Sequence, residues 1–432
     1  MFFLERSLNI VRFSGRIGLL TPNKWFRANY ASSLRAVLIA KARIHLLVDF
    51  GHSRDLFPDA DTFPAAVVFE PVASMPNPQT ELHFVRAHDS DRQHHTLTEL
   101  LRNHYIIVPH CSLKSEQWRL EDRGVSDLLS RLMQTGIPLS RVLKRPILSG
   151  LKTGFNEAFY INSCTRDALV AQSPECAPLL KRFLRGRDIH RWSAKWDNQW
   201  HIVIPSSQNR KWPWSDAHEA DAETIFAELY PSLHQHLKPF EGKLKSRQDK
   251  GRFWWELRAC DYYDEFAKPK IVVQCIAYFS QYALDTDGYT LNNKAILIPS
   301  DDPYLLAILN SQIIWWITWR TFQHMKDEGL SVDVQYLKPL PVPTPPDNLR
   351  EEIRSTALRV IEAQNESEDI EQIYSLELRL NDLVEEAFQV TDDERSVLQR
   401  SLPLRDPLMV LRHKVSGDSK AEEAANHPTA LL

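Results

Sequence analysis

Two short stretches of the sequence bring cationic and aromatic side chains together. The candidate contacts are Arg182, Arg185, Arg187 and Arg191 in the first stretch and Lys245, Arg247, Arg252, Trp254 and Arg258 in the second. Arginine and lysine neutralise phosphate groups whatever the base sequence, and arginine also pairs with guanine in the major groove. A solvated helix face has a similar composition, so each stretch alone leaves both interpretations open. Their occurrence within one region favours a polyanionic partner.

A third stretch, SGLKTGFNEAFYI from Ser149 to Ile161, places polar side chains between short apolar runs. No acid, base or nucleophile partner can be named for Lys152 or Asn156. These two side chains could contact a phosphate backbone or tie two domains together. Gly154 permits a turn that a larger side chain would strain. Turn chemistry favours a structural turn here, and contact with DNA stays open as the alternative.

The patterns of common catalytic and metal sites are absent from the sequence. The five cysteines form no CxxC pair, and the histidines lack partners at metal-ligand spacing, so no metal site is expected. No GxSxG, Walker A or GxGxxG sequence occurs. Scattered cysteines, odd in number, fit a reducing cytoplasm. The apolar run from Tyr304 to Trp319 is broken by Asn310, Ser311 and Gln312, which indicates a buried helix and no membrane span.

Hydrophobic periodicity predicts α/β structure in the N-terminal part. Helical spacing over 1–13 and 29–40 alternates with short apolar strands at 16–20, 45–50 and 65–69. This order matches the C-terminal half of a Rossmann-like, doubly wound sheet. Residues 72–118 are polar and rich in His, Pro and Asp, and we expect a linker with little regular structure there. A helix is predicted over 125–135.

The rest of the sequence predicts an α+β domain and a helical tail. Strands are expected at 200–204, 270–275 and 295–298, and helices at 222–229, 230–248 with a break at Pro239, and 304–321. Amphipathic helices follow at 348–365 and 368–388. The predicted fold class is α/β plus α+β, and the predicted parts are 1–71, 72–145, 146–345, 346–413 and a disordered tail, 414–432.

Several segments, in this order, resemble adenine-specific DNA methyltransferases of type II restriction-modification and BREX-type phage-defence systems. The start, FLERSLNIVRFSGRIGLLTPNKWFRANYASSLRAVL, and Asp49 to Glu70 look like the part of the catalytic domain after its catalytic motif. Later segments look like a TaqI-like specificity domain: Gly150 to Ile161, Arg182 to Ile189, Leu237 to Tyr263, Leu305 to Ser311 and Tyr336 to Pro343. The resemblance covers most of the chain up to about Glu394. It assigns 1–71 to the catalytic domain and 146–345 to target recognition.

The resemblance implies binding of double-stranded DNA and, in the complete enzyme, methyl transfer from S-adenosylmethionine to N6 of adenine. The family's cofactor loop and Asn-Pro-Pro-Tyr loop lie upstream of the segment where the match begins. Asn77-Pro78 is followed by Gln79 and is no substitute. We therefore expect a target-recognition portion that lacks the cofactor site, is inactive alone and works with a separate chain carrying the S-adenosylmethionine-binding half. A truncated non-catalytic remnant, or a protein-interaction module with incidental basic patches, stays open.

Four residues of the catalytic part have expected roles through the same resemblance. In the family, an aromatic residue between the last strands stacks on the flipped adenine, and Phe57 matches that position. A loop anchor is the alternative for Phe57. Asn23, Lys24 and Trp25 follow the first predicted strand, at the edge of an α/β sheet where ligands bind. They are expected to line the active-site crevice, without individual roles.

Overall fold

The computed structural model describes residues 2–416, apart from 54–55, 57–61, 78, 89–91, 93–94, 117, 119, 326–328, 367–368 and 404. The chain divides into two compact units. Unit 1 comprises Met1–Leu132, Trp319–Leu330 and Thr391–Leu402, and unit 2 comprises Met133–Thr318, Ser331–Val390 and Pro403–Leu432. Each unit therefore collects segments that are distant in the sequence.

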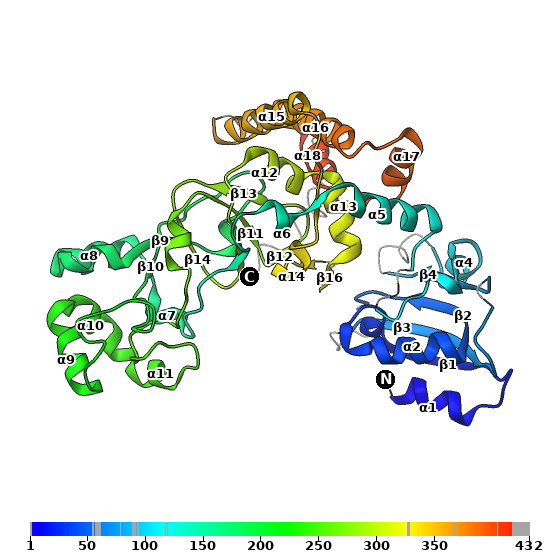
Figure 1. Cartoon of the computed structure of the whole chain (residues 1–432), viewed down its shortest axis with the longest axis horizontal. Helices are drawn as coiled ribbons and strands as arrows, with labels where there is room; N and C mark the ends of the chain where they lie inside the picture. Colours follow the sequence, from blue (N-terminus) through cyan, green and yellow to red (C-terminus); the bar gives the residue numbers. More distant parts are fainter. Residues whose placement is uncertain are drawn as a thin grey trace. The chain divides into compact units, whose positions relative to one another are not determined.

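Unit 1 is built on one five-stranded sheet (Figure 1). Its main elements are α1 (Phe2–Ile10), β1 (Ile17–Pro22), α2 (Ser32–Lys41), β2 (Ala42–Asp49), β3 (Pro64–Pro71), β4 (Glu81–Arg86), α4 (Leu97–Asn103), β5 (Tyr105–Pro109), α5 (Arg123–Thr135) and α17 (Asp392–Arg400). The strand order is β1-β3-β2-β4-β5. β3 is antiparallel to β1 and β2, β2 is parallel to β4, and β4 is antiparallel to β5. β1 and β2 therefore run in the same direction, joined by α2.

The expected linker over 72–118 is wrong, because β4, α4 and β5 lie within it and extend the sheet. β4 buries Leu82 and Phe84, while Glu81 and His83 are exposed. This alternation spans only six residues and is obscured by neighbouring polar residues. α4 begins at a capping box in which the Thr96 side chain accepts from the backbone N–H of Glu99. The mixed α/β architecture is confirmed, whereas the Rossmann-like half stays a prediction.

β1 forms an edge of the sheet in unit 1. Its partner is β3, and no second strand lies beside it within the part of the chain that the structure describes. Leu20 of β1 is 57% exposed. α1 buries Leu4 and leaves Phe3 exposed. Apolar side chains therefore remain accessible at the β1 edge and on α1.

The remaining elements are short strands interleaved with helices. The strands are β6 (Ile137–Pro138), β7 (Leu148–Ser149), β8 (Tyr160–Asn162), β9 (Leu180–Leu184), β10 (Gln199–Ile202), β11 (Lys270–Gln274), β12 (Ile276–Ala277), β13 (Tyr282–Asp285), β14 (Thr290–Leu291), β15 (Ala295–Ile298), β16 (Gln323–His324), β17 (Leu330–Ser331) and β18 (Pro341–Val342). The helices are α6 (Leu139–Val142), α7 (Asn156–Phe159), α8 (Ser163–Gln172), α9 (Glu219–Leu229), α10 (Pro231–Leu237), α11 (Glu241–Ser246), α12 (Pro303–Asn310), α13 (Gln312–Thr321), α14 (Val334–Leu337), α15 (Asp347–Glu366), α16 (Ile370–Ala387) and α18 (Pro407–Ser416).

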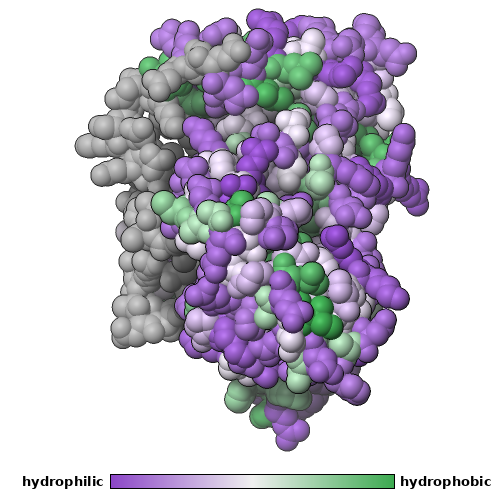
Figure 2. Space-filling view, turned by 90° about the vertical axis from the view of Figure 1, so that its left-hand side faces the viewer, coloured by the Kyte–Doolittle hydropathy of each residue, from purple (hydrophilic) through white to green (hydrophobic). Residues whose placement is uncertain are grey.

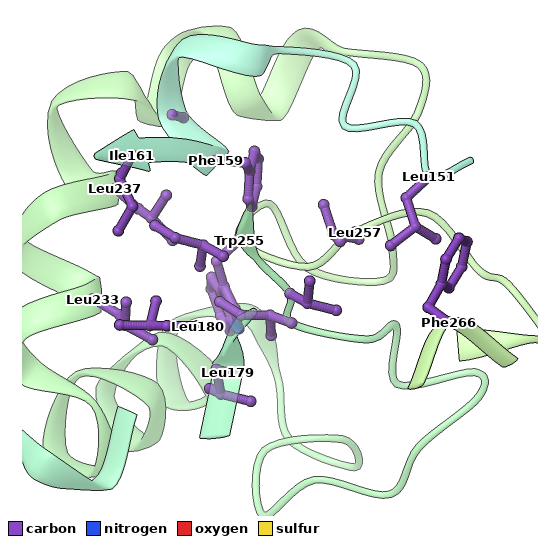
Figure 3. Close-up of a cluster of buried hydrophobic side chains, with 14 of the residues drawn as sticks. Leu151, Phe159, Ile161, Leu179, Leu180, Leu233, Leu237, Trp255, Leu257 and Phe266 are labelled. Carbon is purple, nitrogen blue, oxygen red and sulfur yellow. The ribbon is translucent and has the colours of Figure 1, made fainter. Parts of the chain in front are cut away.

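Unit 2 contains two four-stranded sheets, ordered β14-β9-β10-β8 and β13-β11-β15-β7. One hydrophobic cluster joins residues of both sheets to α9, α10 and α11. Trp255 lies inside this cluster near Leu180 and Leu237 (Figure 3). Its ring stacks on Phe226 and Phe253, with centroids 5.0 Å apart in each pair. The aromatic residues of the second basic stretch therefore build a core. The side of unit 2 that carries α8, α9 and α10 is mostly hydrophilic on its surface (Figure 2).

Two long predicted helices are interrupted in the structure. Pro239 lies in a 3-10 turn, Lys238–Phe240, between α10 and α11, as predicted. The single helix expected over 304–321 is instead two helices, α12 and α13, because Ser311 is extended at φ −68° and ψ 157°. The Asn310 side chain bonds both the backbone N–H and the carbonyl of Tyr282 in β13. No helix among the described residues is long and apolar enough to cross a membrane.

Candidate nucleic-acid interface

Arg191 is buried and does not reach a DNA-binding surface. Its side chain is 9% exposed and forms an ion pair with Glu377 of α16, which is fully buried. Nη1 donates to the carbonyls of Ser280 at 3.0 Å and Asn310 at 2.7 Å. Trp192 Nε1 donates to the same carboxylate at 2.8 Å. The expected DNA contact by Arg191 is therefore wrong, because its guanidinium forms an ion pair with the buried Glu377, which is distant in the sequence.

Arg247 and Trp254 are also core residues. Arg247 is 7% exposed, and its guanidinium donates to the carbonyls of Thr153, Trp254 and Glu256. Burial lowers the pKa of Arg247 to about 10. Trp254 is 2% exposed. Neither side chain can contact DNA in this structure, so both expectations are corrected. Both side chains instead stabilise the loop after α11.

The SGLKTG stretch packs on the same loop through Arg247. Gly154 has φ +68°, a left-handed conformation that side-chain-bearing residues rarely adopt, which confirms the predicted turn. Thr153 is 1% exposed, and its hydroxyl donates to the Asn156 side-chain oxygen at 2.6 Å. Asn156, at the start of α7, is exposed like Lys152, and only its side-chain oxygen is engaged by Thr153 inside the turn. Lys152 and Asn156 therefore both stay candidate DNA contacts.

Three exposed cations meet around residues 292–294, and we call Lys152, Arg187 and Lys294 the turn cluster. Leu151 pairs with Asn292 in a parallel bridge, which places Lys152 next to this turn. A Cβ atom on Gly186 would lie 2.9 Å from the Lys294 carbonyl oxygen, so only glycine allows the Arg187 segment to approach so closely. The backbones that carry the three cations are therefore adjacent.

The turn cluster is not neutralised by acidic side chains in the described structure. No ion pair joins Lys152, Arg187 or Lys294 to a carboxylate among the described residues, and all three are exposed. Lys294 was not among the residues predicted from the sequence. The Asn-Asn-Lys sequence carries no motif, and its only signal is the turn propensity of asparagine.

The other predicted cations are solvent-accessible but paired with acids or carbonyls. They are Arg182 with Asp287, Arg185 with Asp188 and Asp197, Lys245 with Glu241 and Glu219, Arg252 with the Ser215 carbonyl, and Arg258 with Asp249. Exposed ion pairs contribute about 0–1 kcal/mol, so a group on DNA can replace an exposed acid at low cost, whereas Asp188, one of the two acids paired with Arg185, is buried. These cations stay candidates for DNA contact.

In unit 1, Asn23 and Asp49 meet where β1 and β2 end. Asn23 Nδ2 donates to Asp49 Oδ1 at 2.8 Å. Burial raises the pKa of Asp49, but the nearby His88 ring and hydrogen bonds from the Gly51 N–H and Asn23 outweigh it and lower the pKa to about 2. The carboxylate is therefore ionised and points at the sheet edge where a crevice was expected.

The two neighbours of Asn23 differ in exposure. Lys24 is exposed, whereas Trp25 is 3% exposed and packs against Trp118 with ring centroids 5.1 Å apart. Trp25 therefore belongs to the core of unit 1, which corrects its expected place in the crevice.

Phe57 lies outside the described residues. Among the residues that the structure does describe, no three His, Cys, Asp or Glu side chains converge as metal ligands would.

Two family models match separate parts of the chain. Residues 181–342 match the TaqI-like C-terminal specificity domain, and residues 1–57 match the Eco57I restriction-modification methylase. No curated protein matches the chain in sequence. The turn cluster therefore lies within or beside the segment that matches the specificity domain.

The chain spans about half the length of the restriction-modification enzymes whose solved structures align with it. The type IIL restriction-modification enzyme MmeI, solved in complex with DNA, aligns with a TM-score of 0.57 at 10% identity over 95% of this chain and 52% of that chain. The type IIG restriction endonuclease BpuSI aligns with a TM-score of 0.34 at 13% identity over 90% and 49%. At this identity the likeness to MmeI concerns the fold alone. The chain is therefore similar in two separate segments to parts of restriction-modification enzymes: residues 1–57 to the Eco57I methylase family and residues 181–342 to the TaqI-like C-terminal specificity domain.

Proposed function

We propose that unit 2 grips duplex DNA and selects the target site of an adenine-N6 DNA methyltransferase that serves restriction-modification or phage defence in the cytoplasm. The observation that carries this proposal is the turn cluster. Three cations that have no acidic partner among the described residues lie on adjacent backbones, and two of them, Arg187 and Lys294, belong to the segment that matches the specificity domain. Unpaired surface cations supply the phosphate contacts on which DNA affinity depends.

The chemistry of methyl transfer is assigned to the complete enzyme. S-adenosylmethionine would supply the methyl group there. A Cβ on Gly51 would lie 2.7 Å from the His88 ring, so this glycine packs against a side chain, which supports a cofactor site outside the described residues of unit 1. The open edge of β1 supports a separate chain that carries the cofactor-binding half and completes the sheet.

The test is DNA binding at two salt concentrations, measured by fluorescence anisotropy with a mixed-sequence duplex. Each phosphate contact contributes about 0.9 to the slope of log K against log salt. The triple variant Lys152→Ala/Arg187→Ala/Lys294→Ala is expected to lower this slope by roughly 2.7 if each cation meets one phosphate. A wild-type chain without salt-dependent binding would overturn the proposal.

The matched control removes three exposed cations from the C-terminal helices. Arg350, Arg354 and Arg379 lie on α15 and α16, and each is ion-paired with an acid. The variant Arg350→Ala/Arg354→Ala/Arg379→Ala changes the net charge equally. An equal loss of affinity in both triple variants would show a general charge effect and not a localised interface.

A further inference from the structure

A buried ion pair organises the turn after β13. Lys270 and Asp285 are 1% exposed or less and are 2.5 Å apart. The Asp285 carboxylate also accepts the backbone N–H groups of Asp287 at 2.9 Å, Gly288 at 3.0 Å and Tyr289 at 3.1 Å. One carboxylate therefore fixes the whole turn from inside the fold.

This turn holds the guanidinium of Arg182 from two sides. Arg182 Nη2 donates to the Asp287 carbonyl at 3.1 Å and lies 3.4 Å from its carboxylate. The guanidinium carbon lies 4.9 Å from the centroid of the Tyr289 ring and 5.8 Å from that of Trp196. The Tyr289 hydroxyl in turn donates to Asp287 at 3.2 Å. Arg182 keeps 38% side-chain exposure in spite of these contacts.

The arrangement leaves hydrogen-bond donors available in a fixed plane. Asp287 is the acceptor for Nη2, and the structure gives Nε and Nη1 no acceptor among the described residues. An arginine that is held in one plane has already lost most of the rotamer freedom that a two-pronged contact would otherwise cost.

We infer that Arg182 reads a base edge in the target site and that the base is guanine, whose O6 and N7 accept an arginine fork in the major groove. The inference rests on the proposed binding of DNA. Contact with a phosphate is disfavoured at Arg182 because its guanidinium also donates to the Asp287 backbone carbonyl, which keeps the Asp287 carboxylate beside it, and that carboxylate repels a phosphate. Asp287 and Tyr289 are positioning residues for Arg182, and the turn cluster supplies phosphate contacts.

The spacing along β9 fits one protein element that tracks one groove. Arg182 lies near the start of β9, and Arg187 follows its end by three residues. Five residues span at most about 16 Å at roughly 3.3 Å each, and less here because Gly186–Asp188 form a 3-10 turn. That upper limit corresponds to about five base pairs of duplex at 3.4 Å per step. A base contact at Arg182 and a phosphate contact at Arg187 can therefore belong to one recognition site.

The experiment is selection from a randomised duplex pool by the full chain, with sequencing of the bound fraction. Wild type is expected to enrich a motif that contains guanine at one position with about 5- to 150-fold discrimination. Arg182→Ala and Arg182→Lys are expected to lose the preference at that position while the rest of the motif and the salt slope are kept. Tyr289→Phe, which keeps the ring and removes the hydroxyl, is expected to weaken the same preference partly.

The control is Arg166→Ala. Arg166 also lies over an aromatic ring, 4.7 Å from the centroid of Trp200, and is paired with Asp167 at 2.8 Å. The motif should be unchanged in this variant. An unchanged motif in Arg182→Lys overturns the inference and leaves DNA recognition intact, whereas a wild-type chain that binds without any motif overturns the proposed selection of a site. A melting curve for each variant excludes unfolding, and Arg182→Lys retains the charge and most of the stem if Arg182→Ala does not fold.

Discussion

Arg191 Nε donates to both carboxylate oxygens of Glu377 at 3.0 Å across 186 residues of sequence. Neither side chain is more than 9% exposed. The pair connects the loop between β9 and β10 with α16, so the helical segment is part of the same folded unit as the specificity domain. A cut near residue 345 would leave a buried guanidinium without its counter-charge.

Glu377→Ala is expected to destabilise unit 2 by about 3–5 kcal/mol, because it leaves Arg191 buried and unpaired. The free energy of unfolding is measured by denaturant titration. Glu352→Ala is the matched control, since Glu352 Oε1 lies 2.6 Å from Nη2 of Arg379 and both side chains are exposed. The control should lose no more than about 1 kcal/mol. Similar losses in both variants would contradict the assigned burial.

Gly154→Ala is expected to cost about 1–2 kcal/mol of folding free energy, because alanine disfavours the left-handed conformation. The new methyl group would also lie 3.1 Å from the Arg247 side chain. Gly242→Ala serves as the control in α11, where an added Cβ meets open space. That change should stabilise the protein by about 0.5–1 kcal/mol. A stabilising effect at both glycines in thermal melts would refute the turn geometry.

The low pKa of Asp49 predicts that acid destabilises unit 1. Its folded-state pKa of about 2 lies below the ordinary value, so its contribution to stability is present above pH ~4 and is lost as pH falls towards 2. The full contribution is about 2 kcal/mol. In Asp49→Asn, the melting temperature should depend less on pH between pH ~5 and ~2 than it does in the wild type. Glu81→Gln, at an exposed position of β4, is the control, and an unchanged pH profile in Asp49→Asn would contradict the hydrogen-bonding assignment.

Phe57 stays a proposal for base stacking. In an enzyme reconstituted with its cofactor-binding half, Phe57→Ala is expected to lower the methylation rate far more than DNA affinity, because a flipped base needs a flat apolar partner. Transfer of a labelled methyl group and anisotropy measure the two quantities. Equal losses of both would argue for a loop anchor.

The sequence periodicity predicted single helices and strands, but it did not predict the tertiary contacts between them. Apolar runs at 45–50 and 65–69 became β2 and β3, and the stripe at 368–388 became α16. Helix 304–321 broke because Asn310 bonds the backbone of Tyr282, a contact that lies 28 residues away in the sequence. Such a tertiary hydrogen bond leaves no local pattern.

The sequence predicted which cations could form the site, and the structure showed which of them are buried and which are exposed. Sequence marks a cation but not its counter-charge, so Arg191 and Arg247 looked identical to Arg187. Burial separated them, because acids or carbonyls from distant loops surround the first two. Lys294 was missed because its place beside Gly186 depends on how the 292–294 turn folds back.

The open edge of β1 has a consequence for handling the protein. A strand with unpaired backbone groups and an accessible leucine is a template for pairing with another chain. The purified chain should therefore self-associate as its concentration rises, and Leu20→Lys should suppress that association in sedimentation experiments. The edge that we propose as the docking site of a cofactor-binding half would then also pair with copies of this chain.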